Sequence, residues 1–248
     1  MYNYWLGGKD NFAADREAAE EAIAASPGIV ADVRANRAFL ARSVRFLARE
    51  RGVRQFLDIG TGLPAAPNTY EVAQGIDPVA RVVYVDNDPV VVAHARAMMV
   101  SGPDGSVDYV DADLRDPALI LKAAARTLDL NRPVALMLLL ILHLIPDGDG
   151  PHEVVRSLLA GLSEGSYLVL SHPASDIRPD SVAEMTRKMN QRLKGPKATV
   201  RDHDQTSRFF DGLELLAPGV VEPPQWRPDP EEPAPPDVTI WCGAGRKS

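Results

Sequence analysis

The first fifty residues carry apolar side chains at helical spacing, three or four positions apart. Residues 15–25 are rich in Ala and Glu, and a second apolar series runs from Val33 to Leu47 and stops at Gly52. Side chains at this spacing fall on one face of an α-helix, and a glycine commonly ends one. The pattern therefore predicts two helices before the first strand.

After residue 52 the pattern changes to short apolar runs separated by segments of helix length. Runs that are apolar on successive positions are typical of parallel strands covered on both faces. A polar helix is predicted at 180–193, and the pattern as a whole predicts an α/β fold with a doubly wound, mostly parallel sheet. The predicted strands are 55–59, 81–86, 107–111, 134–142, 166–171, 213–221 and 238–242.

Composition and charge narrow the class of protein. The 248 residues are 45% apolar and 25% charged, with a formal net charge of −7, and these are values of a folded globular protein. Basic runs that would follow a phosphate backbone are missing, so we expect no nucleic-acid partner. Cys242 is the single cysteine, and the absence of metal-type Cys/His spacing predicts a cytoplasmic protein without a metal. The longest apolar run, 134–145, is too short to cross a bilayer, so we expect no membrane partner.

The segment FLDIGTGLP joins a predicted strand to a turn with two glycines. Ligands of doubly wound sheets bind at the carboxyl ends of the strands, which places this segment at the site. Gly60 and Gly62 permit a tight turn and open a G-x-G-x-x-A pattern, which is typical of dinucleotide binding. However, Asp58 would repel a pyrophosphate and Pro64 removes an amide donor. We therefore expect a cationic or neutral ligand, and the alternative is a turn that serves only chain reversal.

Two further acids follow the next two predicted strands. Asp86 ends the second strand, where a carboxylate can accept hydrogen bonds from both hydroxyls of a ribose, although a solvated turn acid is the alternative. Asp113 lies just past the third strand, where it could accept from an adenine amino group or cap a helix. Asp88 and Asp116 each precede a proline, and this pair is typical of the start of a helix.

Together these motifs resemble the class I S-adenosylmethionine-dependent methyltransferases. The resemblance rests on FLDIGTGLP, VVYVDNDP, DAD, ILHLIP, GSYLVLSHP, FFDGLELLAPGVV and VTIWCGAGRK, and it covers nearly the whole chain. It implies a Rossmann-like, seven-stranded methyltransferase fold with helices on both faces, and S-adenosyl-L-methionine as the cofactor. The cofactor-binding residues that it implies in these motifs are Asp58, Gly60, Thr61, Gly62, Asp86, Asn87, Asp113 and Leu114.

The opening segment YNYWLGGKDNFAADREAAE is similar to the N-terminal signature of an actinobacterial family of S-adenosyl methyltransferases, first catalogued as a domain of unknown function. The resemblance implies that residues 1–52 form a helical cap or lid on a cofactor-binding domain of residues 53–248, in one structural unit. Gly8 and Asn11 would then contact the cofactor, and the alternative is a loop that only packs the N-terminal helices. We also expect several residues to precede this signature.

The function implied by the resemblance is methyl transfer to an unidentified small-molecule acceptor, on oxygen or nitrogen. Such a reaction requires alignment of an in-line displacement, and it requires a general base only for a protonated hydroxyl or amine. His143, at the end of the fourth predicted strand, is the candidate base, and a core-edge histidine is the alternative; His172 is a weaker candidate. Arg37 could pair with a ligand carboxylate or face water. A non-catalytic cofactor-binding regulator and an NAD-dependent oxidoreductase remain alternatives, and the oligomeric state stays open.

Overall fold

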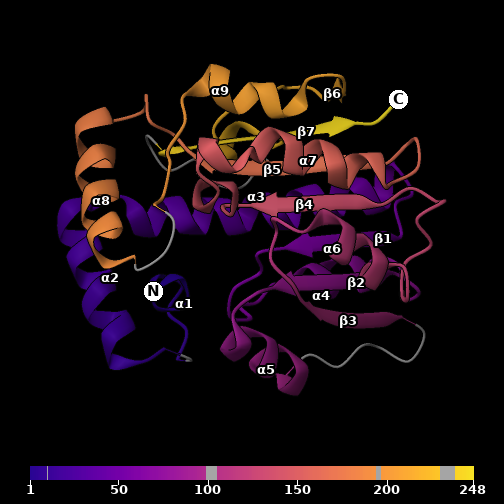
Figure 1. The fold of residues 1–248 in the computed structure, drawn as a ribbon, viewed down its shortest axis with the longest axis horizontal. Helices are drawn as coiled ribbons and strands as arrows, with labels where there is room; N and C mark the ends of the chain where they lie inside the picture. The colour runs from indigo at the N-terminus through magenta and orange to yellow at the C-terminus, as the bar shows by residue number, and fades with distance from the viewer. Residues whose placement is uncertain (10, 99–104, 194–196, 230–237) are drawn as a thin grey trace.

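The computed structural model describes residues 1–9, 11–98, 105–193, 197–229 and 238–248, and a single sheet lies at their centre (Figure 1). Position 10 of the GGKDN segment therefore lies outside the described residues. The strands are hydrogen-bonded in the order β3-β2-β1-β4-β5-β7-β6. Their bounds are Gln55–Ile59 for β1, Arg81–Asp86 for β2, Ser106–Asp111 for β3, Ala135–Leu139 for β4, Tyr167–Pro173 for β5, Glu214–Leu215 for β6 and Ile240–Arg246 for β7.

The sheet is mostly parallel and doubly wound. β1 to β5 run parallel to one another, whereas β7 is antiparallel to both of its neighbours, β5 and β6. This confirms the predicted fold. The chain proceeds outward from β1 to β3 and then returns to β4 on the other side of β1. Such a switch point leaves a crevice at the carboxyl ends of the adjacent strands, where doubly wound proteins bind ligands.

Helices cover both faces of the sheet, and α1, α2 and α8 lie beyond the end toward which β4 points (Figure 1).

Two predicted helix caps are confirmed. Asp88 accepts a hydrogen bond from the backbone N–H of Val90 at 2.8 Å, and Asp116 accepts one from the backbone N–H of Leu119 at 3.0 Å. No helix among the described residues is long and apolar enough to cross a membrane. The α-helices are α1 Tyr2–Trp5, α2 Ala13–Ala25, α3 Ile29–Glu50, α4 Thr69–Gln74, α5 Pro89–Met98, α6 Pro117–Ala124, α7 Pro151–Ala160, α8 Pro179–Arg192 and α9 His203–Ser207; the 3-10 helices are η1 Leu142–Leu144, η2 Asp147–Asp149, η3 Arg208–Phe210 and η4 Pro223–Gln225.

Two hydrophobic cores lie on opposite faces of the sheet. Successive side chains of a strand point to opposite faces, so Phe56 packs in one core with α3 while Leu57 packs in the other with α6 and α7. This arrangement explains why apolar residues follow one another directly in the strands and do not alternate with polar ones. Phe39 and Leu47 of α3 belong to the first core. The division of the chain at residue 52 stays a prediction, and α3 on its N-terminal side packs on the sheet.

The fourth strand is shorter than the sequence predicts. β4 ends at Leu139, and Leu140 adopts a left-handed backbone with φ of 50°, so the chain turns away from the strand direction. The following apolar residues form η1 instead, and Leu142 and Ile145 remain buried in the core. The apolar run therefore predicts correctly which residues are buried, although strand pairing ends before the run does. His143 consequently lies in a 3-10 turn after the strand, which corrects the predicted position.

The sixth strand also differs from its predicted range of 213–221. Pairing is limited to β6, Glu214–Leu215, after which Gly219 adopts a φ of 101° and the chain turns. Val221 returns to the sheet in an isolated bridge with Cys242. The apolar residues between them are therefore a turn that covers the edge of β7, and not a continuous strand.

Candidate functional site

A cavity of about 540 Å³ opens at the carboxyl ends of β1, β2 and β4, and α1, α2, α3 and α8 contribute to its walls. Its volume is in the range of small-molecule binding sites in proteins. Six of the predicted cofactor-binding residues line it together, namely Asp58, Gly60, Thr61, Gly62, Asp86 and Asn87. The topological switch between β1 and β4 thus coincides with the place where the sequence motifs converge.

Asp58 is a buried carboxylate in β1. It accepts a hydrogen bond from the Oγ1 of Thr69 at 2.6 Å. Burial raises the pKa of Asp58 to about 6, although the hydrogen bond from Thr69 and the positive charge of Arg37 act in the opposite direction, and the negative charge of Asp86 adds a smaller increase. A carboxylate that is kept from water in this way favours a cationic ligand, because the ligand's charge would offset the unfavourable burial.

Asp86 holds the glycine turn. Its carboxylate accepts hydrogen bonds from the backbone N–H of Gly62 at 2.9 Å and of Asp88 at 3.0 Å, and burial raises its pKa. Gly60 and Gly62 both have positive φ, of 76° and 61°. A Cβ at Gly60 would lie 2.3 Å from the side chain of Ile141, so only glycine fits there. The turn is therefore built to bring its backbone to the cavity wall.

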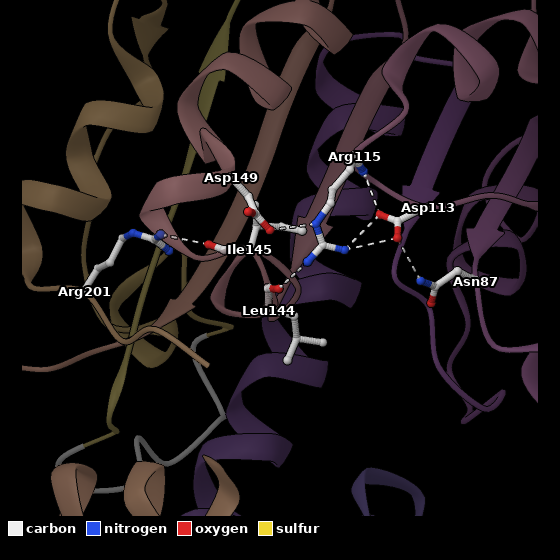
Figure 2. A network of polar contacts seen from close by, with 7 residues as sticks. All are labelled: Asn87, Asp113, Arg115, Leu144, Ile145, Asp149 and Arg201. Carbon is white, nitrogen blue, oxygen red and sulfur yellow. Dashed lines mark hydrogen bonds and ion pairs between the residues drawn. The ribbon is translucent and has the colours of Figure 1, made fainter. Parts of the chain in front are cut away.

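Asp113 and Leu114 line a second, smaller cavity of about 70 Å³, which shares Asp86 and Asn87 with the larger one. Asp113 forms an ion pair with Arg115 at 3.1 Å and accepts a hydrogen bond from the Nδ2 of Asn87 at 3.3 Å (Figure 2). Leu114 is buried in the core. The third acidic motif thus adjoins the main cavity through Asn87, without lining it.

Gly8 and Asn11 are not among the described residues that line either cavity. Asn11 donates hydrogen bonds to the carbonyl of Gly8 at 2.7 Å and to Oδ1 of Asn3 at 3.0 Å. A Cβ at Gly8 would lie 2.4 Å from the Asn3 side chain. Both residues therefore fix the turn after α1, and their contact with the cofactor stays a prediction. The N-terminal segment reaches the cavity through Tyr2 and Trp5 of α1 instead.

A chain of hydrogen bonds that the sequence did not reveal ends at Tyr2. Ser171 Oγ donates to Oδ1 of Asn36 at 2.6 Å, and Nδ2 of Asn36 donates to the hydroxyl of Tyr2 at 3.1 Å. Tyr2 and Asn36 both line the cavity. The spacing of these three residues along the chain does not indicate that they interact, because they come from α1, α3 and β5. Arg37, next to Asn36, also lines the cavity, and its buried Nε has no hydrogen-bond partner among the described residues.

His143 lies on the cavity wall in η1. Burial lowers the pKa of His143 to about 4, and the positive charge of Arg201 contributes, so the ring is neutral at pH 7. Its Nδ1 is buried and has no hydrogen-bond partner in the described part of the chain. A neutral imidazole at a cavity wall can take up a proton, and the role of His143 as the base stays a prediction beside the alternative of a core-edge histidine.

His172, the weaker candidate, is engaged by the protein itself. Its Nδ1 contacts the carbonyl of Pro173 at 3.0 Å, and its Nε2 lies 2.7 Å from Nη1 of the buried Arg201. Because an arginine can only donate, Nε2 must accept and the proton must reside on Nδ1. Burial lowers the pKa of His172 well below its usual value. The ring therefore serves to hold Arg201.

The whole chain, residues 1–248, matches the model of a protein family described as S-adenosyl methyltransferase. This chain belongs to the S-adenosyl methyltransferase family. It is accordingly an S-adenosylmethionine-dependent methyltransferase, and this membership argues against the NAD-dependent oxidoreductase. No curated protein matches it.

Solved structures agree with the family. This S-adenosyl methyltransferase is 41% identical to a DUF574 family protein from Streptomyces avermitilis, with a TM-score of 0.94 and coverage of 100% of this chain and 95% of the other. A proposed methyltransferase from Thermobifida fusca is 40% identical, with a TM-score of 0.89 and coverage of 100% and 93%. The plantazolicin methyltransferase BpumL, solved with S-adenosylhomocysteine (SAH), shares the fold at 12% identity, with a TM-score of 0.57 and coverage of 100% and 94%. The fold predicted from the motifs is thus that of known methyltransferases.

Proposed function

We propose that this S-adenosyl methyltransferase methylates an oxygen or a nitrogen of a small-molecule acceptor inside the cavity of about 540 Å³. The observation that carries the proposal is the sharing of one cavity by the buried carboxylate of Asp58, the half-buried carboxylate of Asp86 and the neutral imidazole of His143. The carboxylates suit a cationic donor, and the imidazole suits removal of a proton from the acceptor.

The residues of the cavity fit S-adenosylmethionine. Asp58 would pair with its ammonium group, Asp86 would accept from its ribose hydroxyls, and the unpartnered Nε of Arg37 would donate to its carboxylate. Asp113 and Leu114, with Asn87, would contact the adenine from the smaller cavity. Gly8 and Asn11 would act on this site by holding α1 against it. The glycine turn at residues 60–62 would let its backbone approach the ligand closely.

When bound, S-adenosylmethionine supplies an activated methyl group, whose carbon–sulfur bond breaks with the electron pair leaving on sulfur as the acceptor atom bonds to the carbon. The protein then has to align the acceptor, exclude water and receive the acceptor's proton. His143 can receive that proton on its neutral imidazole ring. A pKa of about 4 makes it a weak base, but the proton of a hydroxyl becomes strongly acidic as the new bond to oxygen forms, so a weak base suffices for an oxygen acceptor.

The test of this function is the release of SAH from purified protein and S-adenosylmethionine, measured against a panel of phenols, alcohols and amines. We expect turnover with at least one hydroxyl or amine compound, and at least a tenfold lower kcat for His143→Gln with unchanged cofactor affinity by calorimetry. Above pH 5 the wild-type kcat should not depend on the protonation of His143. Equal kcat values in the two proteins would refute the role of His143 as the base.

A further inference from the structure

The cavity has two halves that belong to different parts of the sheet. The acids Asp58 and Asp86 and the glycine turn come from the ends of β1 and β2, on one side of the switch point. The other half lies between α2 and α8, beyond β4, β5 and β7. It is lined by Ala18, Ala22, Val182, Met185, Met189 and Val200. The half that would hold the cofactor is thus polar, and the remaining half is apolar.

The apolar half is lined by one face of α2 and one face of α8, two helices that contact each other. Val182, Met185 and Met189 are spaced three and four residues apart, so they share one face of α8. Val182 is buried, but both methionines remain partly exposed at the cavity. Trp5 adds an aromatic wall, and its indole N–H donates to the carbonyl of Ala19 in α2 at 3.3 Å. Methionine adapts to irregular shapes and makes favourable contacts with aromatic rings, so this half is suited to a ring compound.

The charged side chains that line this half all have partners. Glu21 of α2 forms an ion pair with Arg192 of α8, and Lys188 forms one with Glu184 at 3.5 Å. The buried Asp32 accepts hydrogen bonds from Thr239. No cation at this wall, among the described residues, is left to pair with an anionic acceptor, and Asp58 and Asp86 in the neighbouring half would repel one. The charge pattern therefore favours an uncharged acceptor.

His143 is attached to this half by hydrogen bonds. Its carbonyl accepts from the backbone N–H of Thr199 at 2.8 Å. The neighbouring Ala198 is bound on both sides by Asn190 of α8, whose Oδ1 accepts from the Ala198 N–H at 2.7 Å and whose Nδ2 donates to its carbonyl at 3.1 Å. Thr186 of α8 also contributes a buried hydroxyl without a partner in the described chain. The candidate base is thus held beside the α8 wall, where an acceptor would lie.

We propose that the half of the cavity between α2 and α8 is the acceptor site, and that it binds an uncharged, mainly apolar ring compound whose hydroxyl faces His143. This inference rests on the proposed function, since it assigns the methyl acceptor of the same site. Met185, Met189 and Trp5 hold the ring system, and the acceptor's proton passes to His143 as the methyl group is transferred.

The experiment measures binding of 2-naphthol by calorimetry to protein saturated with SAH. We expect wild type to bind 2-naphthol, and Met185→Glu and Met189→Glu to bind it at least tenfold more weakly with unchanged affinity for SAH. Ala183→Glu adds the same charge at an exposed position of the same helix and should bind like wild type. Where a Glu variant does not fold, the Gln variant at the same position takes its place.

Two outcomes would overturn the inference: wild type that binds SAH but not 2-naphthol, or methionine variants that bind 2-naphthol as wild type does. 4-Hydroxybenzoate tests the charge argument, and binding as tight as that of 2-naphthol would refute an uncharged acceptor. Turnover is scored separately as release of SAH. Binding of 2-naphthol in the α2–α8 half, with no turnover of any hydroxyl or amine compound in the panel, would contradict the proposed oxygen or nitrogen chemistry while leaving the acceptor site in place.

Discussion

Replacing Asp58 with asparagine removes a buried negative charge and keeps the shape of the side chain. In the wild type, burial raises the pKa of Asp58 to about 6, from 3.8 for a free side chain. At pH 7 the folded protein therefore holds a charged carboxylate that water would solvate better. Asparagine can still accept the hydrogen bond from Thr69. We expect Asp58→Asn to be more stable than wild type at neutral pH and to bind S-adenosylmethionine more weakly.

The magnitude follows from the two pKa values of Asp58. At about 1.4 kcal/mol per pH unit, the difference between 3.8 and about 6 amounts to about 3 kcal/mol. Below pH 3.8 the carboxyl group is protonated in both the folded and the unfolded states, so it has no effect there. The wild type loses stability as pH rises, because the unfolded state releases the proton first. The advantage of the variant should therefore be about 1 kcal/mol at pH 4.5 and about 3 kcal/mol at pH 7.5.

Urea unfolding followed by circular dichroism at pH 4.5 and 7.5 measures this difference for wild type and Asp58→Asn. Asp211→Asn, at an exposed position, is the control and should differ from wild type by less than about 0.5 kcal/mol at both pH values. A stability difference for Asp58→Asn that is equal at pH 4.5 and 7.5 would refute the argument from a buried charge. Calorimetry at pH 7.5 should show at least tenfold weaker binding of S-adenosylmethionine, and unchanged affinity would separate Asp58 from the cofactor.

Three other substitutions test the loops around the cavity. Asp86→Ala should weaken binding of S-adenosylmethionine at least tenfold in calorimetry while the protein stays folded. Gly60→Ala should lower the free energy of unfolding in urea by about 2 kcal/mol or more, because its φ is positive and its Cβ would collide with Ile141. Arg201→Met should lower it by about 2 kcal/mol or more, because two buried carbonyls lose their donors.

Each of these expectations has a result that contradicts it. Unchanged affinity of Asp86→Ala would refute the assignment of Asp86 to the ribose. A Gly60→Ala protein as stable as wild type would mean that the turn tolerates a side chain. If Arg201→Met unfolds at the same urea concentration as wild type, the carbonyls that Arg201 contacts are satisfied in another way.

The sequence predicts the first half of the sheet closely, because there each strand is a buried apolar run with a polar boundary. β1 and β2 have the predicted bounds, and the acids Asp58 and Asp86 mark the carboxyl ends of these strands. Parallel strands present these ends at one edge, so finding the strands also locates the acids. This is why six of the predicted cofactor-binding residues lie in one cavity.

The predicted end of a strand is wrong where buried apolar residues continue after strand pairing has ended. Apolar side chains continue after Leu139, but the backbone becomes left-handed at Leu140 and the chain enters η1. The residues that remain apolar there pack into the core from a turn. Hydrophobic periodicity reports only burial, so it cannot place the end of such a strand. The position of His143 was wrong for this reason, although its place at the cavity was not.

Contacts between distant segments were the part of the site that the sequence could not supply. Tyr2, Asn36 and Ser171 are far apart in the chain, and only the fold brings their hydrogen bonds together. The GGKDN segment shows a second limit. The contact of Gly8 and Asn11 with the cofactor stays a prediction, and in the structure both residues fix the turn that follows α1. A motif does not by itself say whether its residues contact a ligand or position their neighbours.

Two arginines hold the loop after β4 from opposite sides, and this links the two halves of the cavity (Figure 2). Arg115 donates to the carbonyl of Leu144 at 3.3 Å and forms the ion pair with Asp113, while Arg201 donates to the carbonyl of Ile145 at 3.1 Å. His143 lies directly before these two carbonyls. A change that moves Asp113, which we propose to lie beside the adenine, would therefore be transmitted through Arg115 to the turn that carries His143.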